Sequence, residues 1–398
     1  MTPIAIVPAG SLSRGRTALS QLPPLSLYVH LPWCIRKCPY CDFNSHEAGE
    51  AIPEARYLDA LRADLEASLP QVWGRGVQTV FIGGGTPSLF SPEGIDRLLR
   101  DVRALLKLAP DAEVTLEANP GTFEQGRFRA FREAGVTRLS LGVQSFDERA
   151  LRALGRVHDR AQALAAAALA AERYPTFNLD LMYALPGQDL AGLEADLAQA
   201  LAFEPPHLSY YHLTLEPNTL FAAKPPEGLP DDDLSADMQQ AIEARTAGAG
   251  LARYEVSAYA RPGHRSRHNL NYWTFGDYLA IGAGAHGKLS FHDRIERSAR
   301  LRHPRAYMDA ALAGDAVEQR RTLSADDLPF EFMLNALRLV EGVSAASFAE
   351  RTGVSLAAIA PALARAAERG LLDPDPSTIR ATPLGLAFLN DLQQMFLT

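Results

Sequence analysis

Short apolar runs alternate with longer amphipathic segments through the first 250 residues of the chain. The apolar runs have the length and composition of buried strands. The segments between them carry apolar residues at helical spacing, as at Leu58, Leu61 and Leu65. The predicted strands are Leu25 to Leu31, Val77 to Ile82, Glu113 to Glu117, Arg138 to Val143, Phe177 to Met182 and His207 to Leu213. The predicted helices are Pro53 to Leu69, Ile95 to Leu106, Phe123 to Ala134, Asp147 to Arg173, Leu190 to Leu201 and Leu234 to Gly248.

This strand–helix alternation predicts an α/β fold with a parallel sheet and right-handed crossovers. Six units are too few for a closed eight-stranded barrel, so we expect an open or partial (β/α)6 barrel. In such sheets the ligand site lies at the carboxyl ends of the strands.

The rest of the chain has a different pattern. A short strand is predicted from Tyr254 to Tyr259. The last segment reads as a small, mostly helical domain of winged-helix type, with helices at Phe330 to Leu339, Ser344 to Thr352 and Leu356 to Arg369 and a wing strand at Ile379 to Thr382. We therefore expect a tail over residues 1–24, the barrel over 25–250, a barrel extension over 251–322 and the C-terminal domain over 323–398.

Composition narrows the class of protein. The chain has 398 residues, of which 47% are hydrophobic, enough for one large and one small domain. A net charge of −8 argues against a general nucleic-acid surface. No apolar run approaches the roughly 20 residues that span a bilayer. Residues 1–24 contain Arg14 and Arg16 and no acid, so they read either as a transit peptide or, as we expect, as a disordered tail of a cytoplasmic protein.

The only three cysteines, Cys34, Cys38 and Cys41, fall within eight positions. Three thiols cannot form a closed set of disulfides, and a zinc site needs a fourth ligand, for which His30 or His46 is available. Three buried apolar thiols are a further alternative. Three thiolates can also hold three irons of a [4Fe–4S] cluster and leave the fourth iron open to a substrate. An apolar collar suits the shielding of a cluster and is formed by Trp33, Pro39, Tyr40 and Phe43.

Polar or glycine-rich residues end the next four predicted strands. The second strand runs into Gly83-Gly84-Gly85-Thr86-Pro87, where backbone can approach a ligand closely. The third ends at Glu117, the fourth at Gln144, and the fifth carries Asp180. Considered one at a time, the glycine run could be an ordinary turn, and each polar residue could be a helix cap or a solvated side chain. Because they all follow strands of one parallel sheet, we expect them to face the cysteine loop.

The spacing C-x3-C-x2-C resembles that of the radical S-adenosylmethionine (SAM) superfamily. The longer string Y-V-H-L-P-W-C-I-R-K-C-P-Y-C-D-F-N-S-H resembles the oxygen-independent coproporphyrinogen oxidase family, most closely its heme chaperone branch. The resemblance implies a partial (β/α)6 radical SAM barrel with a [4Fe–4S] cluster whose open iron is chelated by SAM. One electron from the cluster would then cleave SAM to a 5′-deoxyadenosyl radical.

The resemblance also assigns roles to residues. It implies that the cysteines bind the cluster and that the backbone of Gly84, Gly85 and Thr86 pairs with the amino group of SAM. Arg156 matches an arginine that pairs with the SAM carboxylate. The remaining residues expected around SAM are Tyr28, Tyr40, Glu117, Gln144 and Asp180.

A second motif lies beyond the barrel. The segment R-H-N-L-N-Y-W, residues 267–273, matches the H-N-x-x-Y-W motif of the heme chaperone branch at His268, Asn269, Tyr272 and Trp273. From residue types alone it reads as a loop histidine with two packed aromatics. The resemblance implies heme contact, since histidine ligates heme iron and flat aromatics suit a porphyrin face. Ile281 to Gly287 follows, is expected to pack against the open side of the barrel, and offers His286 as a second ligand or part of a turn.

One departure separates this chain from the oxidases of the family. They carry a fourth cysteine two residues after the third, where this chain has Phe43. The favoured hypothesis is therefore a chaperone that passes heme to acceptor hemoproteins, respiratory-chain proteins among them. A flavodoxin or ferredoxin would be its electron donor. Any association with a membrane would be made through the acceptor. The alternatives are a coproporphyrinogen III oxidase and another radical SAM reaction. The helix pair near the C-terminus resembles DNA-binding folds, but the family resemblance favours a cover over the substrate side and no nucleic acid.

Overall fold

The computed structural model describes residues 18–121 and 126–397. Most of the predicted N-terminal tail and the start of the helix predicted from Phe123 lie outside these residues. Within them, no helix combines the length and the apolar character needed to cross a bilayer.

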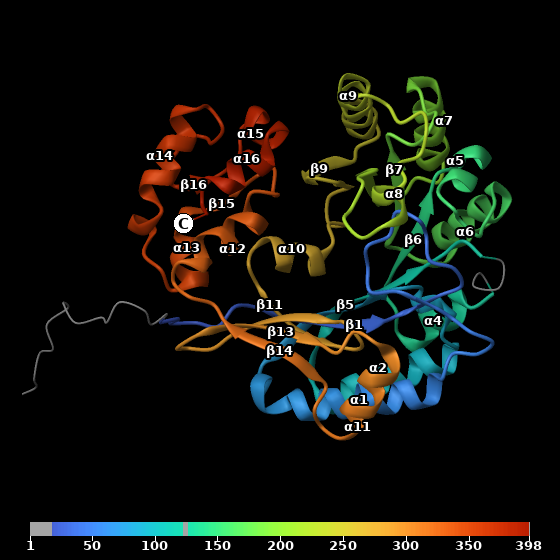
Figure 1. Cartoon of the computed structure of the whole chain (residues 1–398), viewed down its shortest axis with the longest axis horizontal. Coiled ribbons are helices and arrows are strands. Elements are labelled where there is room, and N and C mark those ends of the chain that lie inside the picture. Colours follow the sequence, from blue (N-terminus) through green and yellow to red (C-terminus); the bar gives the residue numbers. More distant parts are fainter. Residues whose placement is uncertain (1–17, 122–125, 398) are drawn as a thin grey trace, which may run out of the picture.

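A large twisted sheet dominates the fold (Figure 1), in the order β14-β13-β12-β11-β1-β4-β5-β6-β7-β8-β10-β9. Its centre is a run of parallel neighbours, which confirms the partial (β/α)6 barrel. These strands are β1 (Leu25–Leu31), β4 (Gly76–Gly84), β5 (Lys107–Ala118), β6 (Arg138–Gln144), β7 (Phe177–Tyr183) and β8 (His207–His212). The helices that connect or follow them are α1 (Glu54–Val72), α2 (Pro92–Leu105), α4 (Phe128–Ala134), α5 (Glu148–Ala153), α6 (Arg160–Arg173), α7 (Leu190–Leu201) and α9 (Asp232–Gly248).

The barrel strands bury both faces, but with different chemistry. In β1 the alternate residues Leu25, Leu27 and Val29 belong to the main hydrophobic core, while Ser26 and Tyr28 point to the other face. The same alternation puts Asn178 and Asp180 of β7 on the inner face. The outer face therefore packs on helices, and the inner face is a polar and aromatic interior.

Both edges of the parallel core carry additional strands. The single strand predicted from Tyr254 to Tyr259 was wrong: residues 256–257 form a turn between two antiparallel strands, β9 (Ala252–Glu255) and β10 (Ala258–Ala260). At the other edge, β11 (Asp277–Ile281) pairs in parallel with β1 and carries the segment around Ile281 to the open side of the barrel, as expected. The antiparallel continuation is β12 (His286–Ser290), β13 (Ile295–Arg300) and β14 (Val317–Thr322), with α11 (Pro304–Leu312) between the last two.

The C-terminal region is mainly helical and has its own hydrophobic cluster, built around Phe332, Phe348 and Leu392. Phe275 and Ile295 of the preceding segment belong to the same cluster, so this region packs on the barrel extension. Its elements are α12 (Asp327–Ala336), β15 (Val343–Ser344), α13 (Ala345–Thr352), α14 (Ala360–Glu368), β16 (Thr378–Ile379), α15 (Pro383–Ala387) and α16 (Leu389–Gln394). The predicted wing is present as the small β15–β16 pair.

Candidate functional site

The cysteine loop is framed by a small pair of parallel strands, β2 (Trp33–Cys34) and β3 (His46–Glu47). Inside it the backbone N–H of Cys41 donates to the carbonyl oxygen of Cys38 over 3.1 Å. The ammonium of Lys37 donates to the carbonyl oxygen of Phe43 over 3.1 Å. These bonds hold the loop after β1, at the carboxyl ends of the parallel strands.

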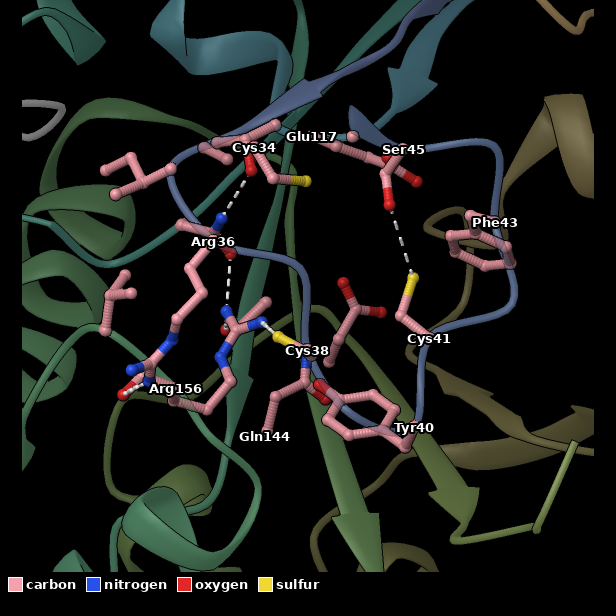
Figure 2. Close-up of a pocket in the computed structure, with 18 of the residues that line it drawn as sticks. Cys34, Arg36, Cys38, Tyr40, Cys41, Phe43, Ser45, Glu117, Gln144 and Arg156 are labelled. Carbon is pink, nitrogen blue, oxygen red and sulfur yellow. Dashed lines mark hydrogen bonds between the residues drawn. The ribbon is translucent and has the colours of Figure 1, made fainter. Parts of the chain in front are cut away.

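A cavity of about 330 Å³ opens beside this loop (Figure 2). It brings together most of the predicted site residues, and those that line it are Cys34, Cys38, Tyr40, Cys41, Gly85, Thr86, Glu117, Gln144, Arg156 and Asp180. Strands β5, β6 and β7 and the loop after β4 supply the floor and walls, as the polar strand ends predicted. A volume of this size is within the range of small-molecule and cofactor sites.

The three thiols surround the cavity without converging on one point. Within residues 18–121 and 126–397, no three histidine, cysteine or carboxylate side chains are placed to hold a single metal ion. Cysteines that each ligate a different iron need no common point, so the arrangement suits a cluster better than a zinc ion. Burial raises the pKa of the Cys34 thiol to about 11, and it raises the pKa of Cys41 as well. Without metal, these thiols therefore keep their protons at neutral pH.

Arg156 is the cationic group inside the cavity. Its guanidinium donates to the sulfur of Cys38 over 3.5 Å, to the carbonyl oxygen of Gly142 over 2.7 Å and to the side chain of Asn119. Burial lowers the pKa of Arg156, but the nearby Tyr40 and Cys38 outweigh burial and raise it overall. Its buried Nε–H has no hydrogen-bond partner in the described chain. A buried donor left open in a cavity is a suitable contact for an anionic ligand group.

Two carboxyl groups, those of Glu117 and Asp180, line the same cavity as Arg156. The Oε2 atom of Glu117 accepts a hydrogen bond from the backbone N–H of Gly84, and burial, together with the charge of Asp180, raises the pKa of Glu117 to about 8. Burial also raises the pKa of Asp180, although its oxygens accept hydrogen bonds from Asn178 and Ser140. These groups can accept from ligand hydroxyls when ionised and donate when protonated.

The glycines after β4 are required by close packing. A Cβ on Gly84, whose φ is +115°, would lie 2.7 Å from the ring of His30, and one on Gly85 would lie 2.5 Å from the carbonyl oxygen of Trp33. The backbone N–H groups of Gly85 and Thr86 donate to carbonyls of Leu31 and Trp33, which joins this turn to the cysteine loop. Glycine therefore allows the strand end to reach the cavity wall.

Gln144 has a strained backbone, with a φ of +66° in a non-glycine residue, and lines the same cavity. Such an outlier at the end of a buried strand is typical of a functional position.

Two aromatic residues near the cysteine loop lie outside the cavity lining. Tyr28 does not line the cavity; it lies behind Gly84 and Glu117, where its hydroxyl and the Nδ1 of His30 are 2.9 Å apart. Trp33, which the sequence placed in the apolar collar, packs into the core against Tyr57 with ring centroids 4.7 Å apart and does not line the cavity. Phe43 lies on the rim of the cavity and is 60% exposed.

The second motif forms helix α10 (Arg267–Trp273), which lies apart from the cavity. His268 is 1% exposed and meets Thr79 near the start of β4, so α10 packs at the amino-terminal part of the strands, away from the cysteine loop. The Nδ1 of His268 is 2.7 Å from the Thr79 hydroxyl and the Nε2 is 2.8 Å from the Tyr272 hydroxyl. Burial lowers the pKa of His268 to about 3, so the ring is neutral.

The other residues of the motif also pack inside the protein. Trp273 lies under the guanidinium of Arg338 at 4.3 Å, and the rings of Tyr272 and Tyr278 are 4.4 Å apart. Asn269 is partly buried in the first turn of α10, where its backbone N–H donates to the hydroxyl of Ser266. The four residues therefore lie together on one helix in this conformation, with little of His268 open to a ligand.

Several lining residues were missed by sequence reasoning, among them Asn119, Ser140, Met182 and Tyr211. Ser140, Met182 and Tyr211 each stand two positions from a polar inner-face residue of the same strand, and Asn119 stands two positions after Glu117, just beyond the end of β5. The period of two along a strand was therefore the signal that could have found them. The described residues beyond Tyr211, those of the C-terminal region among them, contribute nothing to this lining. That the C-terminal region covers the substrate side of the barrel stays a prediction. That region contacts α10 and the barrel extension.

The partial barrel and the cysteine loop at its strand ends are those of a radical SAM protein. Residues 28–200 match the Radical SAM superfamily, and residues 323–388 match the HemN C-terminal domain. A solved structure of coproporphyrinogen III oxidase (HemN) from Escherichia coli, described as a radical SAM enzyme, superposes with a TM-score of 0.80 at 25% identity, over 95% of this chain and 91% of that one.

Full-length relatives specify the family further. The chain is 49% identical to "Heme chaperone HemW" of Escherichia coli (strain K12), over 95% of this chain and 99% of the relative. It is 34% identical to the protein of the same name in Bacillus subtilis (strain 168), over 94% and 99% respectively. The chain belongs to the HemW family of radical SAM proteins.

Proposed function

We propose that this protein is a heme chaperone that holds a [4Fe–4S] cluster and SAM, binds heme and transfers it to acceptor hemoproteins. The observation that carries the proposal is the cysteine trio at the rim of the cavity, with Phe43 in the position where the oxidases have a fourth cysteine. Similarity over nearly the whole chain to proteins named heme chaperones supports the same function.

In this proposal each side of the cavity has one task. Cys34, Cys38 and Cys41 ligate three irons, and the cluster, when bound, supplies an electron to SAM. The Nε–H of Arg156 pairs with the SAM carboxylate, because it is a buried cationic donor that lacks a partner. Glu117 and Asp180 accept from the ribose hydroxyls. The other SAM contacts are assigned to Tyr28, Tyr40, Gly84, Gly85, Thr86 and Gln144.

Heme contact is assigned to His268, Asn269, Tyr272 and Trp273. Iron ligation by His268 requires one of its two hydrogen bonds, to Thr79 or to Tyr272, to break. Heme binding is therefore coupled to movement of α10, and a slow step is expected. Acceptors are hemoproteins, respiratory-chain members included, and a flavodoxin or ferredoxin supplies electrons; nucleic acid is not a partner. The protein acts in the cytoplasm and reaches membranes only through its acceptors.

The four-part division of the chain is also part of the proposal. Support comes from two separate hydrophobic clusters, one under the barrel and one in the C-terminal region. The extension over 251–322 contributes Phe275 and Ile295 to the second cluster and so joins the two parts.

A heme titration of the anaerobically reconstituted protein, followed by the Soret band, tests the proposal. We expect saturation near one heme per chain and weaker binding in His268→Ala. His292→Ala is the matched control, because His292 is exposed and lies outside the motif. Equal heme binding by both variants would show that heme does not bind at α10. Absence of heme binding in the wild type would contradict the chaperone function.

The alternative is an oxygen-independent coproporphyrinogen III oxidase, which forms protoporphyrinogen IX by radical decarboxylation. Its support is the TM-score of 0.80 with the E. coli oxidase. Incubation with coproporphyrinogen III, SAM and a reductant distinguishes the two. We expect no decarboxylation, and turnover at a useful rate would establish the oxidase instead.

A further inference from the structure

A file of buried hydrogen bonds, with side branches from Asn178 to Ser140 and Ser209, runs through the barrel interior from the cavity to α10. It begins at Asp180, whose Oδ1 accepts from the amide nitrogen of Asn178 over 2.8 Å. The Oδ1 of Asn178 is 2.7 Å from the Nδ1 of His207, and the Nε2 of His207 is 2.8 Å from the hydroxyl of Tyr254. The hydroxyl of Tyr254 also accepts from the backbone N–H of Ser266 over 3.3 Å.

The donors and acceptors in this file can be assigned from chemistry. The amide nitrogen of Asn178 donates to Asp180, so the amide oxygen of Asn178 faces His207. His207 therefore donates from Nδ1. Burial, with the charges of Arg138 and His264, lowers the pKa of His207 well below its ordinary value, so the ring is neutral and Nε2 accepts from Tyr254. His207 and Tyr254 therefore form the link between Asn178 and the backbone of Ser266.

The far end of the file is the N-terminus of the second motif. Ser266 caps α10, because its hydroxyl accepts from the backbone N–H of Asn269. Helix α10 is only seven residues long, too short to be stable by propensity alone. Its position depends on anchors such as this cap and the His268–Thr79 bond. A short anchored helix is an element that can open locally without unfolding the barrel.

We propose that His207 is a positioning residue that couples ligand binding at Asp180 to the stability of α10. The inference rests on the proposed function, which assigns SAM to the cavity. A cationic ligand in the cavity favours the ionised form of Asp180, which is the stronger acceptor for Asn178. Buried hydrogen bonds in series polarise one another, so the bonds of His207 and Tyr254 strengthen in turn and hold the cap of α10. Coupling is reciprocal, so a loosened α10 weakens the ligand in the cavity by the same factor.

The test is amide hydrogen exchange of α10, read by mass spectrometry on the cluster-loaded full chain with and without SAM and with no reductant present. We expect SAM to slow exchange in the peptide over residues 266–274 by about fivefold or more in the wild type, a typical size for coupling between sites. Tyr254→Phe removes the hydroxyl and should abolish the slowing. Tyr174→Phe is the matched control, because it also deletes a buried tyrosine hydroxyl bond, to the carbonyl of Phe128, outside the file.

The outcomes separate this inference from the proposed function. Equal slowing in Tyr254→Phe, or none in a wild type that binds SAM by equilibrium dialysis, would overturn the coupling. Absence of SAM binding in the wild type would instead overturn the proposed function, and the inference with it. If Tyr254→Phe does not fold by circular dichroism, His207→Leu carries the same test, because a leucine can neither donate to Asn178 nor accept from Tyr254.

Discussion

The backbone N–H of Gly84 donates a hydrogen bond of 3.0 Å to the Oε2 atom of Glu117. This bond joins the glycine turn after β4 to the carboxyl group at the end of β5, two parts of the site that are far apart in sequence. It favours the ionised carboxylate, but burial and the charge of Asp180 outweigh it, and the pKa of Glu117 rises to about 8. In the ligand-free protein this carboxyl is largely protonated at neutral pH.

The stability of the ligand-free protein should therefore fall as pH rises from about 5 to about 8. In this range the unfolded chain has lost the Glu117 proton and the native state still holds it, so ionisation favours unfolding. Glu117→Gln keeps an acceptor for Gly84 and removes the titration. Between about pH 6 and about pH 7.5 the variant should lose up to about 2 kcal/mol less stability than the wild type. Urea unfolding at the two pH values measures this.

Glu227→Gln, at an exposed carboxyl, is the control and should follow the wild type. Because burial raises the pKa of Asp180 in the same direction, some fall should remain in Glu117→Gln. A variant with the full wild-type pH dependence would show that Glu117 is ionised throughout.

Loss of any one cysteine should prevent cluster assembly. Cys34→Ser, Cys38→Ser and Cys41→Ser should each reduce bound iron from about four per chain to below one, since no other cysteine exists to replace the lost ligand. Iron and acid-labile sulfide analysis after anaerobic reconstitution is the measurement. Phe43→Ser is the control and should keep the full iron content. Because burial raises the pKa of Cys34 to about 11, assembly must release protons and should strengthen with rising pH.

Arg156→Lys should weaken SAM binding by about 1–3 kcal/mol, or roughly five- to 150-fold, because an ammonium cannot reproduce the several N–H donors of the guanidinium. Equilibrium dialysis with the cluster-loaded protein measures the affinity. Arg152→Lys, on the exposed side of α5 beside Glu148, is the matched control and should bind as the wild type does. Equal affinity in the two variants would mean that Arg156 serves only the cysteine loop.

Asp64→Asn should destabilise the fold strongly. Asp64 of α1 is buried, pairs with Arg300 at 3.1 Å and accepts from the hydroxyl of Tyr307 of α11. Its loss leaves a buried guanidinium uncompensated, at a cost of about 3–5 kcal/mol. Asp309→Asn breaks an exposed pair with Arg56 between the same two helices and should cost less than about 1 kcal/mol. Urea unfolding compares them, and similar losses would contradict the role of burial.

Much of the site could be predicted from the sequence because its residues lie at the ends of predicted strands. Cys34, Glu117, Gln144 and Asp180 are distant in sequence, but parallel strands put their carboxyl ends on one side of the sheet. Arg156 was found only through family resemblance, since it follows a helix and nothing local distinguishes it from a surface arginine. Asn119 was missed although it stands only two residues after Glu117, just beyond the end of β5.

The sequence by itself determined the strand–helix alternation, and with it the partial barrel and the side that carries the cysteines, because hydrophobic periodicity and strand direction are local properties. Only the tertiary structure decided that His268 lies buried against Thr79 and that Asn178 faces His207 across β7 and β8. Those relations depend on strand register and on how a later helix enters the barrel. The position of the helix is set by packing between residues more than a hundred positions apart, such as Thr79 and His268. The register is set by strand pairing, and no local pattern encodes either relation.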